Sequence, residues 1–259
     1  MNHTATLGEK NYTILPFAMD EGVMARAAIG LVVLETDQTI EHEWRQIMML
    51  PGVAYFEARL PSPADIGLAS LARMEAHITP ATRLIVPDVE LDVVAFGCTS
   101  GSIVIGEDKV FKQIRDARPG VACTTPITAA MAGLHALGVH RTALITPYVH
   151  SINEVFRQHI EAGGIEVPRI GTFNHANDSE VARIDRASLR AAILAAGAAS
   201  DVDAVFVACT SLRMADLTRE VEQELGKPVV SSNCAMAWHA LRLAEVRDSL
   251  PRFGRLFEV

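Results

Sequence analysis

The sequence has few cysteines, no cysteine pair at metal-binding spacing and no long apolar run, and each absence excludes a class of protein. Its four cysteines in 259 residues are too few for a disulfide-stabilised scaffold. None of them forms a Cys-x-x-Cys pair or has a histidine at zinc spacing, so we expect no metal site. No apolar stretch reaches the ~18 to 20 residues that a membrane-spanning helix needs.

Basic clusters and nucleotide-binding loops are also missing. The net charge is −8, from 23 Lys and Arg against 31 Asp and Glu, and no run of Lys or Arg occurs. We therefore expect neither a nucleic acid nor a membrane as a partner. No glycine-rich phosphate loop is present, so we expect no nucleotide and no other cofactor. The polar residues 1–10 do not resemble the apolar core of a signal peptide, and we predict a cytoplasmic protein.

Short apolar runs alternate with longer amphipathic segments along most of the chain. The apolar runs predict strands at 29–34, 53–59, 92–97, 142–146, 204–208 and 227–230. The amphipathic segments predict helices at 39–50, 66–78, 102–118, 127–137, 151–162, 188–198, 213–225 and 234–246. Strands that are apolar on both faces and alternate with helices are typical of a parallel sheet covered on both sides. The predicted fold class is α/β.

The chain also contains an internal repeat. The segment DVVAFGCTS at Asp92–Ser100 recurs as DAVFVACTS at Asp203–Ser211, with similar segments before and after each copy. This pattern predicts two similar doubly wound lobes related by a pseudo-twofold axis, with the active site in the cleft between them. We place an N-terminal arm at residues 1–27, the first α/β lobe at 28–138 and the second at 139–259.

The repeated Cys-Thr-Ser turns are the strongest candidates for chemistry. Each follows a predicted strand and precedes a predicted helix, which is where ligands bind in open parallel sheets. Unpaired N–H groups and the helix dipole at such a position bind anions and lower the pKa of a thiol. Two related lobes would place Cys98 and Cys209 on opposite sides of one cleft. The neighbouring hydroxyl donors are Thr99, Ser100, Thr210 and Ser211.

Two facing thiols allow two reactions. One thiol can remove a proton from carbon while the other returns a proton to the opposite face. Alternatively, one thiolate adds to a double bond while the other thiol protonates it. The structural alternative is that the duplication preserved a helix-capping motif and that the cysteines only fill small spaces in the core.

The paired motifs resemble the aspartate/glutamate racemase superfamily. The similarity is to the branch of maleate cis–trans isomerases and arylmalonate decarboxylases, and within it most to the ectoine-utilisation proteins. It covers the chain from about Ile29 to Val246. The resemblance implies that Cys98 and Cys209 are the two catalytic cysteines. It implies substrate-binding roles for Thr99, Ser100, Tyr148 in a Thr-Pro-Tyr turn, Asn177 in the segment NDSEVAR, Thr210 and Ser211.

One residue departs from the pattern of the maleate isomerases. These enzymes have an asparagine after the first strand that hydrogen-bonds a substrate carboxylate, whereas Asp37 stands at this position here. An ionised aspartate only accepts hydrogen bonds and would repel a second carboxylate. Asp37 therefore favours a substrate ammonium or amide N–H. It could also cap the helix predicted to begin near Thr39, and the two roles are compatible.

The resemblance implies a cofactor-independent isomerase, racemase-like, that acts on a small carboxylate. Together with Asp37 it suggests an amino-acid-like intermediate of ectoine degradation. The alternatives are a maleate cis–trans isomerase and a non-catalytic carboxylate-binding protein. A decarboxylase is disfavoured because the decarboxylases of this branch keep only the second cysteine. The family also implies a homodimer.

Overall fold

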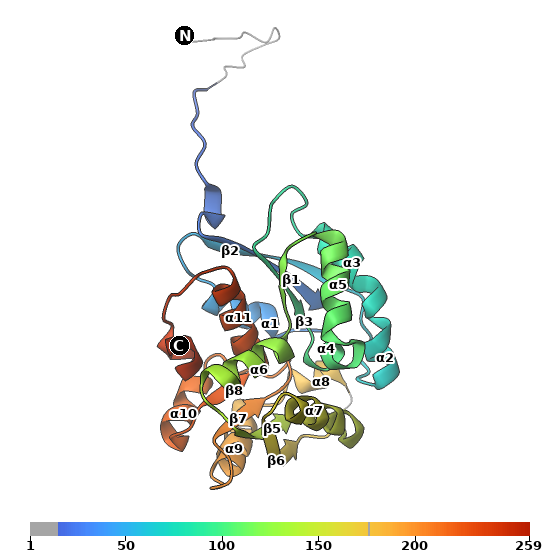
Figure 1. The fold of residues 1–259 in the computed structure, drawn as a ribbon, viewed down its shortest axis with the longest axis vertical. Coiled ribbons are helices and arrows are strands. Elements are labelled where there is room, and N and C mark those ends of the chain that lie inside the picture. Colours follow the sequence, from blue (N-terminus) through green and yellow to red (C-terminus); the bar gives the residue numbers. More distant parts are fainter. Residues whose placement is uncertain (1–14, 176) are drawn as a thin grey trace.

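The computed structural model describes residues 15–175 and 177–259. The predicted arm at 1–27 lies partly outside these residues. Its described part runs away from the body of the molecule and includes a short 3₁₀ helix at Gly22–Met24 (Figure 1). The first strand begins at Ala27, so the last residue of the predicted arm belongs to the first sheet.

The described residues form two parallel four-stranded sheets with the same strand order. The first sheet has the order β2-β1-β3-β4 and the second the order β6-β5-β7-β8. The first sheet comprises β1 (Ala27–Leu34), β2 (Val53–Leu60), β3 (Val93–Gly97) and β4 (Ala122–Thr124). The second comprises β5 (Arg141–Thr146), β6 (Glu166–Thr172), β7 (Ala204–Val207) and β8 (Val229–Ser231). The predicted two-lobed α/β fold class is confirmed.

Helices cover the sheets. In the first half they are α1 (Ile40–Ile47), α2 (Leu68–Arg73), α3 (Glu75–Leu84), α4 (Thr99–Ile105), α5 (Glu107–Ala117) and α6 (Pro126–Ala136). In the second half they are α7 (His150–Ala162), α8 (Asp178–Val181), α9 (Arg186–Gly197), α10 (Thr218–Leu225) and α11 (Ser232–Leu243), before 3₁₀ turns at Pro251–Phe253 and Arg255–Glu258. Strands β1, β3 and β7 are buried along their whole length, as expected for strands covered on both faces.

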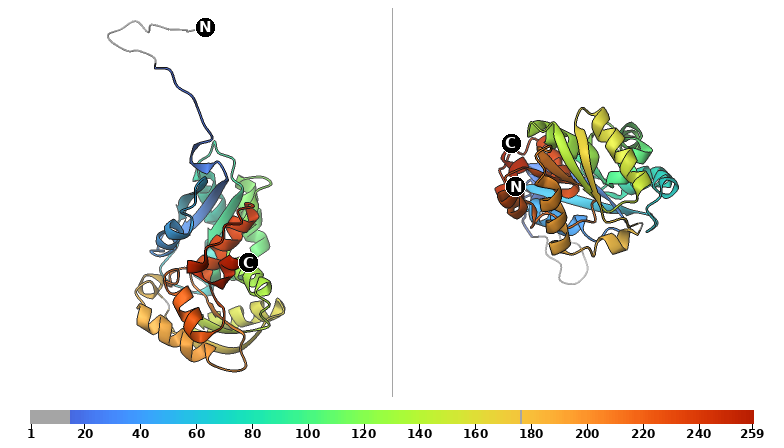
Figure 2. Two further views of the ribbon diagram at one scale, coloured as in Figure 1. Left: turned by 90° about the vertical axis from the view of Figure 1, so that its left-hand side faces the viewer. Right: turned by 90° about the horizontal axis from the view of Figure 1, so that it is seen from below.

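The last long helix joins the two sheets. Helix α11 follows β8 but packs against α6, α1, β3 and β4 of the first half. Figure 2 shows it, in dark red, alongside the blue and green strands of the first sheet. The predicted lobe boundary near residue 138 lies between β4 and β5. Helix α11 belongs to the second half of the chain but packs against the first. Helix α11 thus fixes the carboxyl end of β3 in the first sheet relative to that of β7 in the second.

Several predicted elements differ from the observed ones. Strands β4 and β6 were not among the six predicted strands: β4 has three residues, and β6 is a largely exposed edge strand that contains Pro168. The helix predicted at 102–118 is two helices, because Gly106 has a φ of 94°, which a continuous helix does not allow. The helix predicted at 66–78 is also divided, into α2 and α3.

Among the described residues, no helix is both long and apolar enough to cross a membrane. The same part of the chain holds no group of three or more His, Cys, Asp or Glu side chains that could bind a metal ion.

Candidate active site

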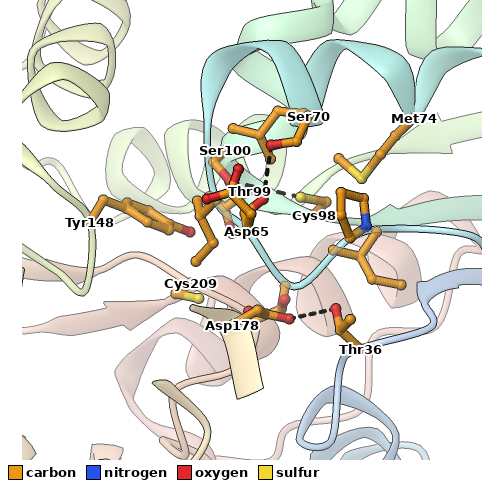
Figure 3. A pocket seen from close by; sticks show the side chains of 15 residues that line it. Thr36, Asp65, Ser70, Met74, Cys98, Thr99, Ser100, Tyr148, Asp178 and Cys209 are labelled. Atoms are coloured by element: carbon orange, nitrogen blue, oxygen red, sulfur yellow. Dashed lines mark hydrogen bonds between the residues drawn. The ribbon is translucent and has the colours of Figure 1, made fainter. Parts of the chain in front are cut away.

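The two repeated cysteines line one pocket. Cys98 directly follows β3 and Cys209 comes two residues after β7, so the thiols extend equivalent strands of the two sheets. Figure 3 shows them approaching the pocket from different walls, Cys98 from the first half of the chain and Cys209 from the second. The cavity has a volume of about 20 Å³, enough for about one water molecule.

Cys98 caps the helix that it precedes. Its Sγ accepts a hydrogen bond from the N–H of Gly101 at 3.2 Å and lies 3.8 Å from Oγ of Ser100. We expected this position to lower the pKa of the thiol. Burial instead raises the pKa of Cys98 to about 12, because the residue is 4% exposed and its two hydrogen bonds offset only part of the lost hydration.

Cys209 has different surroundings, and the predicted helix start at this turn is wrong. Its Sγ accepts a hydrogen bond from the N–H of Ser211 at 3.4 Å, but the chain continues as turns until α10 begins at Thr218. A buried carboxylate, that of Glu43, accepts hydrogen bonds from the amides of Met214 and Ala215 in this turn. Burial, and then the charge of Asp178, raise the pKa of the Cys209 thiol above its ordinary value.

Tyr148 lies in the wall of the same pocket, with its ring directed into it (Figure 3). It follows β5, is 2% exposed and stacks on Phe156 with ring centroids 5.2 Å apart. Burial and the nearby Cys209 and Cys98 raise the pKa of Tyr148 well above its ordinary value. The phenol therefore stays protonated and can donate a hydrogen bond to a substrate oxygen.

Three of the four predicted hydroxyl residues line the pocket. Thr99, Ser100 and Thr210 are buried in its wall. The hydroxyl of Thr99 is hydrogen-bonded to that of Ser232 at 2.9 Å, which links the first Cys-Thr-Ser turn to α11. Ser211 is not part of the lining; its hydroxyl donates to Asp178 at 2.7 Å. The structure thus brings the two repeated turns together, and the substrate-binding roles stay predictions.

Asp37 and Asn177 cap helices and do not line the described pocket. Oδ1 of Asp37 accepts hydrogen bonds from the N–H groups of Thr39 at 2.7 Å and Ile40 at 2.8 Å, at the start of α1. Asn177 accepts from the N–H of Glu180 at 3.3 Å and caps α8. The capping interpretation of Asp37 therefore describes its contacts, and the substrate-binding roles of both residues stay predictions.

The sequence analysis missed the loops that close the pocket. Asp65 and Asn177 form an isolated antiparallel bridge, and the N–H of Asp178 donates to the carbonyl of Ala64 at 2.9 Å. Thr36 donates to Asp178 at 2.8 Å. Pocket residues that the sequence analysis did not single out include Thr36, Asp65, Ser70, Met74 and Asp178. These loops lie outside the repeated segments. The one sequence feature that pointed to them is that Asp178 directly follows Asn177, which the family resemblance implies to bind substrate.

Comparison with known proteins places this site in a family. The family model described as arylmalonate decarboxylase matches residues 73–257, which include both Cys-Thr-Ser turns and Tyr148. The chain belongs to the arylmalonate decarboxylase family. It is 38% identical to the arylmalonate decarboxylase of Bordetella bronchiseptica over 141 residues, which cover 54% of this chain and 59% of that protein.

Maleate isomerases of the same branch match a greater length of the chain than this decarboxylase does. The maleate isomerase of Nocardia farcinica is 27% identical over 238 residues, covering 88% of this chain and 94% of that protein. A structure of Nocardia farcinica maleate cis–trans isomerase, a cysteine-to-serine mutant with a covalently bound succinylcysteine intermediate, has a TM-score of 0.81. It is 26% identical and covers 89% of this chain and 98% of that one. The predicted branch is therefore confirmed.

The position of Gly101 leads to a prediction about Cys98. A Cβ at residue 101 would lie 2.8 Å from Sγ of Cys98 and 2.6 Å from Cε of Met74. Met74 can rotate away, but the thiol is confined by the pocket. We expect Gly101→Ala to displace the thiol and to lower kcat by about 10- to 100-fold, since misplacement of a reacting group by about 1 Å has effects of this size. Steady-state kinetics with the substrate found in the D₂O panel proposed for this protein measures this effect.

The matched control is Gly133→Ala in α6. A Cβ there would meet only the flexible side chain of Leu256, at 3.0 Å. Neither Gly133 nor Leu256 lines the pocket. The kcat of this control should equal that of the wild type. Wild-type kcat in Gly101→Ala would show that the position of the Cys98 thiol does not limit the reaction.

A second prediction concerns the pH dependence of stability. Burial raises the pKa of Glu43 from 4.5 to about 7, despite hydrogen bonds from Ala215, Asn233 and Met214. Because the folded state binds this proton more tightly than the unfolded state, the stabilisation is complete below about pH 4.5 and is lost as the pH rises through 7. A shift of this size corresponds to about 3 kcal/mol of unfolding free energy.

Guanidinium unfolding at several pH values between 5 and 8, for wild type and Glu43→Gln, tests this prediction. Glutamine does not titrate, so the stability of the wild type relative to the variant should fall as the pH rises. A difference between the two proteins that stays constant with pH would contradict the assignment. Comparison with the variant also removes the contribution of other groups with raised pKa values, such as Asp37.

Proposed function

We propose that the protein is a cofactor-independent isomerase that uses Cys98 and Cys209 on a small carboxylate substrate. The observation that carries the proposal is that thiols from equivalent strands of two related sheets line one small pocket. In racemisation, one cysteine as thiolate removes the α-proton and the other as thiol delivers a proton to the opposite face. After one turnover the two cysteines have exchanged protonation states, and the enzyme is ready for the product enantiomer.

The pocket supplies the donors that this reaction needs. Removal of an α-proton places negative charge on the substrate carboxylate, and fixed donors stabilise that charge. The phenol of Tyr148 and the hydroxyls of Ser100 and Thr210 lie in the pocket wall. The finer part of the proposal, based on resemblance to the ectoine-utilisation proteins, is that the substrate is an amino-acid-like intermediate of ectoine degradation.

The second candidate is maleate cis–trans isomerisation. The match to a maleate isomerase over 88% of the chain favours it. In this reaction one thiolate forms a bond to an alkene carbon and the other thiol protonates the adjacent carbon. Rotation about the resulting single bond, loss of the same proton and breakage of the C–S bond then release the trans alkene.

Incubation in D₂O with a panel of substrates distinguishes these activities. The panel contains maleate, aspartate, glutamate, 2,4-diaminobutyrate and its acetyl derivatives, with an arylmalonate added because of the family. Proton NMR follows α-deuteration, and chiral chromatography follows inversion. Deuterium incorporation with loss of optical purity supports the racemase. Conversion of maleate to fumarate establishes the alternative, and release of CO₂ from the arylmalonate would establish a decarboxylase. Saturable binding without any turnover would favour a non-catalytic carboxylate-binding protein.

The expected homodimer has a candidate contact surface in the projecting arm. Leu15, Phe17 and Met19 are 72%, 76% and 85% exposed on a segment that leaves the body of the molecule (Figure 2). A second copy that covers these side chains would remove apolar surface from water. We expect light scattering after size exclusion to give a dimer for the full chain and a monomer for Phe17→Ser/Met19→Ser. A dimer in both proteins would place the interface elsewhere.

A further inference from the structure

Asp178 presents a buried carboxylate to the pocket that holds both thiols. It is the first residue of α8 and is 7% exposed. Its Oδ2 accepts a hydrogen bond from Thr36 at 2.8 Å, and its Oδ1 accepts one from Ser211 at 2.7 Å. Figure 3 shows the carboxylate beside Cys209, joined to Thr36 by a dashed line. A carboxylate has about four acceptor positions, so Asp178 can accept a further hydrogen bond from a ligand.

The charge around Asp178 is not balanced by a cationic side chain. The residues that line the pocket include Asp65 and Asp178 but no lysine, arginine or histidine. Within the described part of the chain, Asp178 takes part in no salt bridge.

An unpaired carboxylate in a buried pocket needs a positive partner or a proton. A buried charge without a counter-charge costs several kcal/mol. Thr36 and Ser211 donate hydrogen bonds to Asp178 but carry no positive charge. The pocket is therefore complementary to a ligand that carries an ammonium group at this wall.

We propose that Asp178 is a specificity-determining residue that binds a substrate ammonium group and discriminates against dicarboxylates. The proposal rests on the proposed function and specifies its substrate class as a small carboxylate that carries a protonated amine. The carboxylate of this substrate faces the neutral donors Ser100, Thr210 and Tyr148, and its ammonium group faces Asp178. A second carboxylate in place of the ammonium would meet a like charge in a site with little solvent.

The same contact affects the thiols. The charge of Asp178 is one cause of the raised pKa of Cys209, and both it and Asp37 raise the pKa of Cys98. A bound ammonium group offsets this charge and makes either thiolate easier to form, whereas a dicarboxylate makes it harder. Binding of the substrate ammonium group beside Asp178 thus favours formation of the thiolate that reacts with the substrate.

Calorimetric titration at pH 7.5 with 2,4-diaminobutyrate and with succinate tests the proposal without requiring turnover. We expect the wild type to bind the diamine at least ~10-fold more tightly than succinate. Asp178→Asn should weaken diaminobutyrate binding by at least ~10-fold and leave succinate binding unchanged or tighter. Asp216→Asn, at an exposed aspartate outside the pocket lining, makes the same charge change and should bind both ligands as the wild type does.

Two results would overturn the proposal: tighter binding of succinate than of the diamine by the wild type, or equal discrimination in Asp178→Asn and wild type. The comparison of ligands on the wild type remains decisive if Asp178→Asn does not fold. Failure of the proposed function has a different signature, namely normal discrimination between the ligands with no isomerisation of any of them.

Discussion

Replacement of Cys209 by serine is expected to lower kcat for isomerisation by about three orders of magnitude, and Cys98→Ser is expected to do the same. A serine hydroxyl ionises far less readily than a thiol, so the variant loses one of its two proton-transfer groups, and such groups contribute about 10²- to 10⁴-fold. Chiral chromatography of the substrate identified in the D₂O panel measures the effect. The two thiols are expected to matter equally because each serves one direction of the reaction.

Exchange in D₂O separates a two-base mechanism from other uses of the thiols. Each single variant keeps one functional thiol, so it should exchange the α-proton of one enantiomer and not of the other, with opposite preferences in the two variants. Cys123→Ser is the matched control, because this cysteine is buried in β4 and does not line the pocket. Racemisation at the wild-type rate in either catalytic variant would refute the mechanism.

Replacement of Glu43 by leucine is expected to reduce the free energy of unfolding by about 3 kcal/mol or more. The Glu43 carboxylate accepts hydrogen bonds from the amides of Met214 and Ala215 and from Nδ2 of Asn233. Leucine accepts none of them, and each buried donor left without a partner costs about 1 to 3 kcal/mol. Leucine also removes a carboxylate whose burial is unfavourable, which offsets part of this cost. The offset is small because burial raises the pKa of Glu43 to about 7, so the group is only partly ionised near neutral pH.

This substitution should also lower activity in the folded protein. Asn233 donates to the carbonyl of Thr210 at 2.8 Å, so Glu43 holds the turn after Cys209 through a single intermediate side chain. Chemical denaturation measures the stability change. His42→Leu, at an exposed position of the same helix, should remain within about 0.5 kcal/mol of the wild type. Equal stabilities for Glu43→Leu and His42→Leu would show that Glu43 does not support this turn.

Some features were predictable because their cause lies in short stretches of the chain. Fully buried parallel strands have to be apolar on both faces, so β1, β3, β5 and β7 could be recognised from composition alone. The duplicated Cys-Thr-Ser turn identified equivalent strand ends, and the structure places Cys98 and Cys209 at one pocket. The edge strand β6 was not predicted because it is largely exposed and its residues form no continuous apolar run.

The sequence by itself determined the α/β class, the duplication and the two thiols, since these depend on local hydrophobic pattern and on repetition. Only the tertiary structure decided the surroundings of the thiols. The chain after Cys209 continues as turns until α10 begins at Thr218, so no helix dipole acts directly on this thiol. Asp37 accepts hydrogen bonds at the start of a helix, and Asp178 lines the pocket. Charge, burial and hydrogen bonding at the site come from residues distant in the sequence, and no local pattern encodes which of them meet.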